Sequence, residues 1–178
     1  MSGIFRKIEA TEIQEGYDII VARTNWLNQQ GIRQWTQPIP FEVISQRQVA
    51  GRFFGYWVNG GLTAVVCLLD KSVLDWGDQM QGNYLCMATL ASAVQHKGKG
   101  YGEECAIEAC NYSKTNGCEK VYLDCVDNDG ALPRFYSKLG FEILNTMSYA
   151  GGFEIVLMVK YLTDSKLMEN SNNVFGVD

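Results

Sequence analysis

The sequence predicts a single domain of the α/β (α+β) class, in which a mixed, mostly antiparallel sheet of about six to seven strands is flanked by helices. The length of 178 residues corresponds to about one domain. Apolar segments bounded by turn signals alternate with amphipathic stretches. A strand, helix, strand succession over residues 84–126 predicts a crossover between parallel strands, and the remaining strands are expected to pair antiparallel.

The N-terminal third carries one strand pattern and two helix patterns. Thr11 and Glu12 precede apolar residues at helical spacing, which predicts the start of a helix. Pro38 and Pro40 then interrupt the chain. The expected elements are a strand over 4–9, a helix over 11–29 and a second helix over 41–52.

Most strands are expected after residue 52. Asn59-Gly60 is a strong hairpin signal between two apolar runs. A helix from about Gly102 to Thr115 carries small residues at helical spacing, which favours close packing on a sheet. The expected strands are 53–58, 62–69, 83–93, 120–126, 141–149 and 153–161, with a polar loop over 70–82 and a short helix over 131–139. These elements predict one domain over 1–162, followed by a polar C-terminal tail over 163–178.

Charge and hydropathy exclude two classes of partner. The formal net charge of −5 argues against general nucleic-acid binding, because that affinity comes from cations that displace counterions from phosphates. The longest apolar run, Ala64–Leu69, is far shorter than the roughly 20 residues of a membrane span. We therefore expect no nucleic-acid and no membrane partner. Lys97 and Lys99, inside the one glycine cluster, suit a small anionic ligand.

The six cysteines predict reduced thiols rather than disulfides or a metal site. Most of them lie in apolar runs, where a free thiol packs as a small hydrophobic group. The chain has no CxxC pair and one histidine, His96, so we expect no metal. Residues 1–7 lack the apolar core of a signal peptide, which predicts a cytoplasmic protein.

Gly98, Gly100 and Gly102 lie between a predicted strand and a predicted helix. Glycine permits positive φ and a close approach of the backbone to a ligand, and a helix start offers unpaired N–H groups. This combination suits a pyrophosphate. Glu103 replaces the last glycine of the dinucleotide pattern GxGxxG, and no Walker pattern is present. The glycines alone are equally consistent with a flexible turn and solvated lysines.

The segment Asn83–Gly102, NYLCMATLASAVQHKGKGYG, resembles the acyl-CoA-binding segment of the GNAT superfamily of N-acyltransferases. That segment has the pattern R/Q-x-x-G-x-G/A after a strand that ends in Leu-Ala-Val. Leu90-Ala91-Ser92 matches the strand end and Lys97–Gly102 matches the loop, with Lys97 in place of the usual Arg or Gln. A register over Gln95–Gly100 also satisfies the pattern, but the distance from the strand and the helix after Gly102 favour the first register.

A second segment, Asp124–Phe141, is similar to the later GNAT motif. It reads DCVDNDGALPRFYSKLGF. The matching residues are Asn128, Ala131, Phe135, Tyr136, Lys138, Gly140 and Phe141. The interval from Asn128 to Tyr136 is one residue longer than in the family pattern, so Asp129 is the alternative to Asn128.

The resemblance implies a GNAT-like domain that transfers an acetyl group from acetyl-CoA, its co-substrate, to a primary amine of a small molecule or a peptide. It implies that main-chain groups at Leu90 and Ser92 pair with the pantetheine amides and that the glycine loop binds the pyrophosphate. The implied cofactor-binding residues are Leu90, Ser92, Lys97, Gly98, Lys99, Gly100, Tyr101, Gly102 and Asn128. The expected partners are the amine acceptor and, as an option, a second copy of the chain in a homodimer.

Tyr136 is the candidate general acid. A tyrosine with a pKa of about 10 is protonated at neutral pH and can donate to the leaving thiolate; packing beside Phe135 is its structural alternative. We expect direct attack by the amine, with a covalent route through Cys86 or Cys125 as the alternative.

The general base and the acceptor pocket are less defined. The predicted strand 83–93 has no carboxylate, and Asp70, Asp75 and Asp78 in the preceding loop are candidate bases. Trp35 is a candidate wall of the acceptor pocket, and Arg33 is a candidate partner for a carboxylate. Because no base is assigned, a non-catalytic acyl-CoA-binding module remains the alternative function.

Overall fold

The computed structural model describes residues 3–127, 129–149 and 151–162. Asn128 and the predicted tail over 163–178 lie outside the described residues.

Seven strands of the described chain form one sheet, in the order β1-β2-β3-β4-β5-β7-β6. The strands are β1 (Ile4–Lys7), β2 (Phe53–Val58), β3 (Gly61–Leu69), β4 (Tyr84–Ser92), β5 (Lys120–Val126), β6 (Glu142–Tyr149) and β7 (Phe153–Tyr161). Only β4 and β5 pair in parallel, and all other neighbours are antiparallel. The predicted fold class and the predicted crossover are therefore confirmed.

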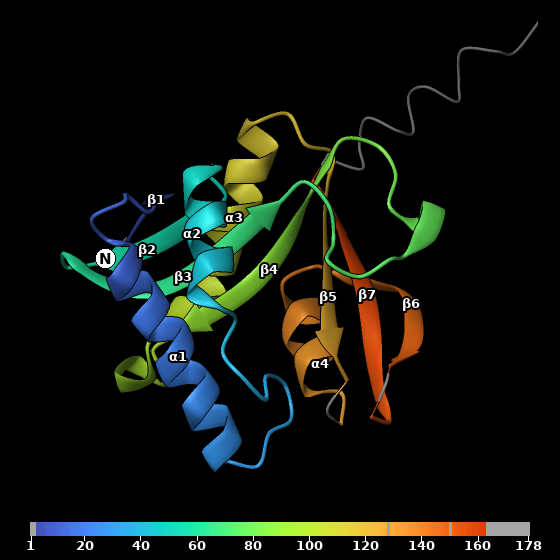
Figure 1. The fold of residues 1–178 in the computed structure, drawn as a ribbon. Helices are drawn as coiled ribbons and strands as arrows, with labels where there is room; N and C mark the ends of the chain where they lie inside the picture. The colour runs from blue at the N-terminus through green and yellow to red at the C-terminus, as the bar shows by residue number, and fades with distance from the viewer. Residues whose placement is uncertain (1–2, 128, 150, 163–178) are drawn as a thin grey trace, which may run out of the picture.

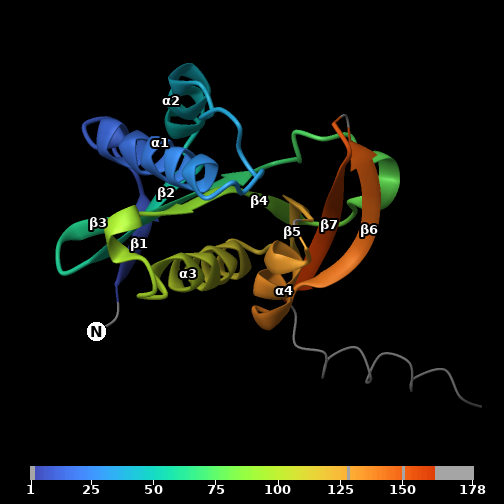
Figure 2. The same cartoon turned by 90° about the horizontal axis from the view of Figure 1, so that it is seen from below.

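The helices form a layer on each side of the sheet, as Figure 2 shows. They are α1 (Ile13–Gln29), α2 (Phe41–Val49), α3 (Tyr101–Thr115) and α4 (Ala131–Lys138). α1 and α2 cover one face, and α3 and α4 cover the other. On α3 the small residues Cys105, Ala106 and Ala109 are fully buried against the sheet, which confirms the close packing predicted for that helix.

The largest differences between the observed and the predicted element boundaries lie in the N-terminal third and around the glycine cluster. The first strand ends at Lys7, and α1 begins at Ile13 because the Glu12 side chain is held by Arg6 and by the Glu9 amide. α2 ends at Val49, because Gly51 adopts a φ of 68° that breaks the helix. The glycine cluster does not follow β4 directly, since a 3-10 turn over Val94–His96 intervenes, and α3 begins at Tyr101.

The sheet opens between β4 and β5. The two strands pair only from Tyr84 to Cys86, against Lys120 to Tyr122, and Figure 1 shows that they diverge beyond this point. β4 also carries a bulge, at which Thr89 has a φ of 57°. The second half of β4 consequently presents a main-chain edge that β5 does not cover.

All six cysteines are free thiols, and all but Cys118 are buried. No helix of the described residues is long and apolar enough to cross a membrane.

Burial raises the pKa of several thiols, which makes the stability of this fold sensitive to alkaline pH. The pKa is about 12 for Cys86 and Cys125 and about 11 for Cys110, each mainly because burial disfavours the thiolate. Their stabilising contribution is complete below the unfolded value of about 8.5 and is lost as the pH rises toward the folded values.

We therefore expect the urea midpoint to fall between about pH 7.5 and pH 9.5, measured with a reducing agent. Each buried thiol lowers the free energy of unfolding of the protein by about 1 kcal/mol for each pH unit above the pKa of that thiol in the unfolded chain. Cys110→Ala removes one such group, so its midpoint is expected to depend less steeply on pH. A midpoint that stays constant over this range would contradict the burial of these thiols.

Candidate functional site

The glycine turn before α3 has an open backbone. Gly98 and Gly100 adopt φ angles of 79° and 78°, a conformation that favours glycine, and a Cβ at either would meet no atom within 4 Å. Gly100 is the N-cap of α3, and Gly102, in the first helical turn, faces Ser92 of β4.

Several amides of this turn point at no backbone acceptor. The first intrahelical bond runs from the Glu104 amide to the Gly100 carbonyl oxygen, at 3.0 Å, so the amides of residues 101–103 precede the hydrogen-bonded ladder. Within the described chain, the amides of Gly98 and Gly100 also donate no hydrogen bond to a backbone oxygen. The amides of Lys97 and Lys99, in contrast, donate hydrogen bonds to the carbonyl oxygens of Val94 and His96, each at 3.1 Å.

Leu90 and Ser92 lie on the open edge of β4. The Ala93 amide bonds to Thr63 of β3, so alternation along the strand turns the main-chain groups of Ser92, and likewise of Leu90, away from β3. The predicted pairing of these groups with the pantetheine amides is compatible with this placement and stays a prediction. The Ser92 carbonyl oxygen, however, already accepts hydrogen bonds from Arg23 Nε at 2.9 Å and Nη2 at 2.7 Å.

Arg23 is a site residue that the sequence analysis missed. Its Nη2 also donates to Ser92 Oγ, and its guanidinium lies 5.1 Å from the Trp26 ring. The Lys97 ammonium lies 4.9 Å from the same ring. α1 thus fixes both the end of β4 and the start of the glycine turn. An arginine on an amphipathic helix gives no sequence signal for this contact, because only the fold brings residues 23 and 92 together.

A cavity of about 310 Å³ joins these parts. Its lining combines the glycine turn, the open edge of β4, the end of α1 and the buried side of α4. The lining residues include Arg23, Leu90, Ser92, Gly98, Gly100, Tyr101, Gly102 and Tyr136. The structure therefore brings the predicted loop, strand and tyrosine residues together around one cavity. Lys97 and Lys99 are exposed and do not line that cavity.

A second cavity, of about 190 Å³, adjoins the first. The two share four lining residues, namely Gln34, Trp35, Leu90 and Tyr136. Trp35, the candidate wall of the acceptor pocket, lines both cavities, whereas Arg33 lines neither.

Tyr136 stands at the junction of the two cavities. Its ring is buried against Phe135 and Phe141, at centroid distances of 5.0 and 5.8 Å. Burial raises the pKa of Tyr136 above its ordinary value, so the hydroxyl keeps its proton at neutral and mildly alkaline pH. The hydroxyl makes no hydrogen bond with another residue that the structure describes, and it is therefore available to a ligand.

The carboxylate in the second cavity is Asp124 of β5. The predicted candidates lie elsewhere: Asp70 pairs with Arg52, Asp75 accepts a bond from the Gly77 amide, and neither these two nor Asp78 lines either cavity. A carboxylate on an otherwise apolar inner strand was the available signal for Asp124.

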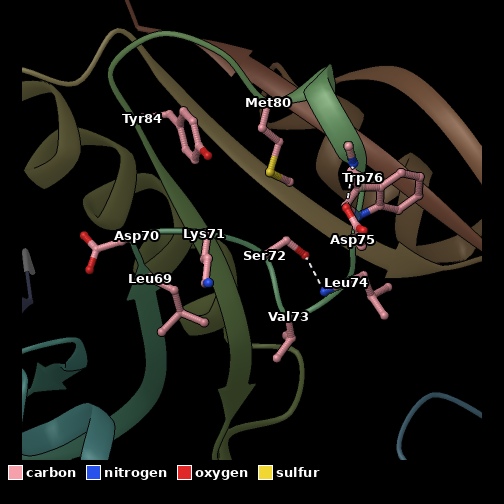
Figure 3. A pocket seen from close by; sticks show the side chains of 11 residues that line it. Leu69, Asp70, Lys71, Ser72, Val73, Leu74, Asp75, Trp76, Met80 and Tyr84 are labelled. Atoms are coloured by element: carbon pink, nitrogen blue, oxygen red, sulfur yellow. Dashed lines mark hydrogen bonds between the residues drawn. The ribbon is translucent and has the colours of Figure 1, made fainter.

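A third and larger cavity, of about 700 Å³, lies within the 69–84 segment, and Figure 3 shows its lining. There the Ser72 hydroxyl accepts a hydrogen bond from the Leu74 amide at 3.0 Å. This cavity contains no part of the glycine turn and does not reach Tyr136. Its contribution to the site is indirect, because its loop supplies Ser72 and Trp76 to Asp124.

Neither Cys86 nor Cys125 is suited to act as a nucleophile. Burial raises the pKa of each thiol to about 12, so almost no thiolate is present at neutral pH. Among the described residues, no group of His, Cys, Asp and Glu is arranged to hold a metal ion.

Comparisons with known proteins agree on one family. The sequence model described as "Acetyltransferase (GNAT) family" matches residues 20–141. The chain is 26% identical over 135 residues to the uncharacterized N-acetyltransferase YesJ of Bacillus subtilis (strain 168), covering 71% of this chain and 74% of that protein.

Solved structures show the same fold. An acetyltransferase of the GNAT family from Listeria monocytogenes superimposes with a TM-score of 0.74 at 18% identity, covering 87% of this chain and 93% of that one. The yncA protein of Salmonella typhimurium, solved with its cofactor acetyl-CoA, gives 0.66 at 15% identity over 92% and 96% of the two chains. The chain therefore belongs to the GNAT acetyltransferase family, and acetyl-CoA is its co-substrate.

Proposed function

We propose that this protein transfers the acetyl group of acetyl-CoA directly to a primary amine of a small molecule or a peptide, with Tyr136 as general acid. The observation that carries the proposal is the junction of two cavities at Tyr136 and Leu90. One cavity contains features that suit a pyrophosphate and an amide chain. The other contains the space for an acceptor, with a carboxylate in its wall.

The residues around the first cavity fit coenzyme A. The unpaired amides at Gly98, Gly100 and the first turn of α3 suit the pyrophosphate, whose charge the helix dipole also stabilises. The amide of Ser92 and the main chain of Leu90 suit the pantetheine arm, as an added strand at the open edge of β4. Because the Ser92 carbonyl oxygen already accepts hydrogen bonds from Arg23, we assign the contact of Ser92 with the pantetheine arm to the Ser92 N–H group.

Direct transfer forms a bond from the amine nitrogen to the acetyl carbon, breaks the C–S bond and leaves the electron pair on the coenzyme A sulfur. Tyr136 then donates its proton to that sulfur. The nitrogen, which is cationic after the attack, releases one proton to solvent water, and Tyr136 regains a proton from solvent. Since a thiol has a pKa of about 8.5 and a tyrosine about 10, net transfer is uphill by at least about 2 kcal/mol. The Tyr136 hydroxyl therefore acts first as a hydrogen-bond donor that stabilises the developing thiolate.

The main-chain N–H of Leu90, on the edge of β4 that faces away from β3, is the group we assign to the thioester oxygen. A fixed N–H aimed at an oxygen that gains negative charge lowers the barrier, because the dipole is already oriented. The uncovered edge beyond Cys86 leaves such donors available.

We propose the cytoplasm as the compartment. The support is the free state of all six thiols, which fits a reducing environment.

Gly100→Ala is expected to weaken acetyl-CoA binding at least about tenfold, because it strains the turn and adds a methyl group where the phosphates approach. Gly117→Ala is the matched control. Gly117, after the other end of α3, has a φ of 84° and equally open surroundings, so it pays a similar strain without touching the site.

Titration calorimetry with acetyl-CoA measures both variants, and denaturant unfolding measures their stability. Equal losses of affinity in the two variants would refute the assignment of the glycine turn to the cofactor. Failure of the parent protein to gain about 2.7 kcal/mol of stability at 100 times the dissociation constant would refute specific binding itself.

Tyr136→Phe is expected to lower kcat by about 100-fold while the affinity for acetyl-CoA stays the same, because only the donated proton is removed. Tyr112→Phe, on a ring that packs on Phe54 at 4.7 Å and lines neither cavity, is the control with unchanged kcat. Thiol release over a panel of amines is the measurement. Binding without turnover of any amine would favour a non-catalytic acyl-CoA-binding module instead.

A further inference from the structure

The second cavity carries a positive and a negative side chain that do not pair with each other. Arg47 of α2 and Asp124 of β5 both line it, and no ion pair within 4.0 Å joins them. Charges of opposite sign in one small cavity attract a ligand that carries both charges. This arrangement is the basis of the inference that follows, which rests on the proposed acetyl transfer.

One nitrogen of the Arg47 guanidinium, Nη1, is held by neighbouring side chains, and the other two nitrogens are available to a ligand. Its Nη1 donates to Thr89 Oγ1 at 2.9 Å and lies 3.7 Å from Cys67 Sγ. Nε and Nη2 form no hydrogen bond with another residue of the described chain. A guanidinium held in this way can donate two parallel hydrogen bonds to a carboxylate.

Asp124 is fixed in the same manner. Its Oδ2 accepts hydrogen bonds from the Ser72 hydroxyl and from Trp76 Nε1, the latter at 3.2 Å. Oδ1 has no hydrogen-bond partner within residues 3–127, 129–149 and 151–162. An ionised carboxylate has about four lone-pair sites, so Asp124 can still accept bonds from an ammonium group. Two donors on the other oxygen hold the side chain in place for that contact.

The remaining walls are mainly apolar and the space is small. Trp35, Ile39 and Ile155 contribute to them. The volume of about 190 Å³ lies below the roughly 300–1,000 Å³ of pockets that take drug-sized ligands. The cavity therefore suits a compact molecule with an apolar part.

We infer that the acceptor is an amino acid, or a similarly small amino carboxylate, whose ammonium group binds Asp124 and whose carboxylate binds Arg47. The apolar walls then receive its side chain. A peptide N-terminus offers no free carboxylate beside the amine, and a simple amine leaves Arg47 without a partner. The ammonium group loses one proton to solvent water before it attacks the thioester, and the nitrogen loses a second proton after the attack. The product is therefore a neutral amide, which removes the attraction to Asp124 and favours product release.

The test compares matched acceptors by thiol release in the presence of saturating acetyl-CoA. The panel contains the apolar L-amino acids, each with its primary amide and with the amine that lacks the carboxylate, such as leucine, leucinamide and 3-methylbutylamine. Loss of a charge-assisted contact is expected to lower kcat/KM by about 10- to 100-fold. Amides or simple amines that equal or exceed every amino acid would overturn the inference.

Arg47→Gln tests the contact with the acceptor's carboxylate. The readout is a ratio of kcat/KM between two acceptors, so the test holds even if the variant lowers both values. It is expected to lower the ratio of kcat/KM for leucine to that for 3-methylbutylamine by about tenfold, and Arg47→Lys is expected to restore part of that ratio. Arg52→Gln removes a guanidinium outside both cavities and serves as the control with the parent ratio. A ratio that Arg47→Gln leaves unchanged would show that Arg47 only supports the Thr89 bulge.

Asp124→Asn tests the ammonium contact. It is expected to raise KM for leucine by about tenfold with little change in the affinity for acetyl-CoA, since Asp124 does not line the first cavity. An unchanged KM would overturn the role assigned to Asp124. Acetylation of simple amines or peptides alone would overturn this inference and leave the proposed function intact, whereas no acetylation of any amine would overturn both.

Discussion

The divergence of β4 from β5 is the constraint on which the rest of this site depends. Parallel strands that stayed paired to their ends would satisfy each other's main-chain groups and close the sheet. Here the pairing stops at Cys86 and Tyr122, and the bulge at Thr89 bends β4 further. The uncovered edge then has donors available for a ligand, and the first cavity is lined there by residues of α1 as well as of α3 and α4.

Each layer of the fold contributes one part of the site at this opening. α1 supplies Arg23, which holds the Ser92 carbonyl, and the start of α3 supplies unpaired amides beside it. α4 places Tyr136 against the opening from the other face. α2 and the loop after β3 carry Arg47 and the partners of Asp124. A cofactor and an acceptor can therefore approach the same tyrosine from two cavities.

Burial decides which of the reactive groups takes part in the chemistry. It raises the pKa of the thiols at Cys86 and Cys125, which keeps them protonated and favours direct transfer over a covalent cysteine route. The same effect keeps Tyr136 in the hydroxyl form that a proton donor needs. Asp124 differs from these groups in its contacts, because two hydrogen-bond donors satisfy one of its oxygens and leave the other oxygen open to a ligand.

The sequence by itself determined the order of the elements, the hairpin at Asn59-Gly60, the glycine turn and the segment of Tyr136. These features depend on local backbone preferences and on periodicity, which a sequence records directly. Only the tertiary structure decided that Arg23 holds Ser92 and that Arg47 and Asp124 share a cavity. Such pairs are separated by about 70 residues or more, and alternation along a strand shows which face a side chain occupies but not which helix or loop covers it.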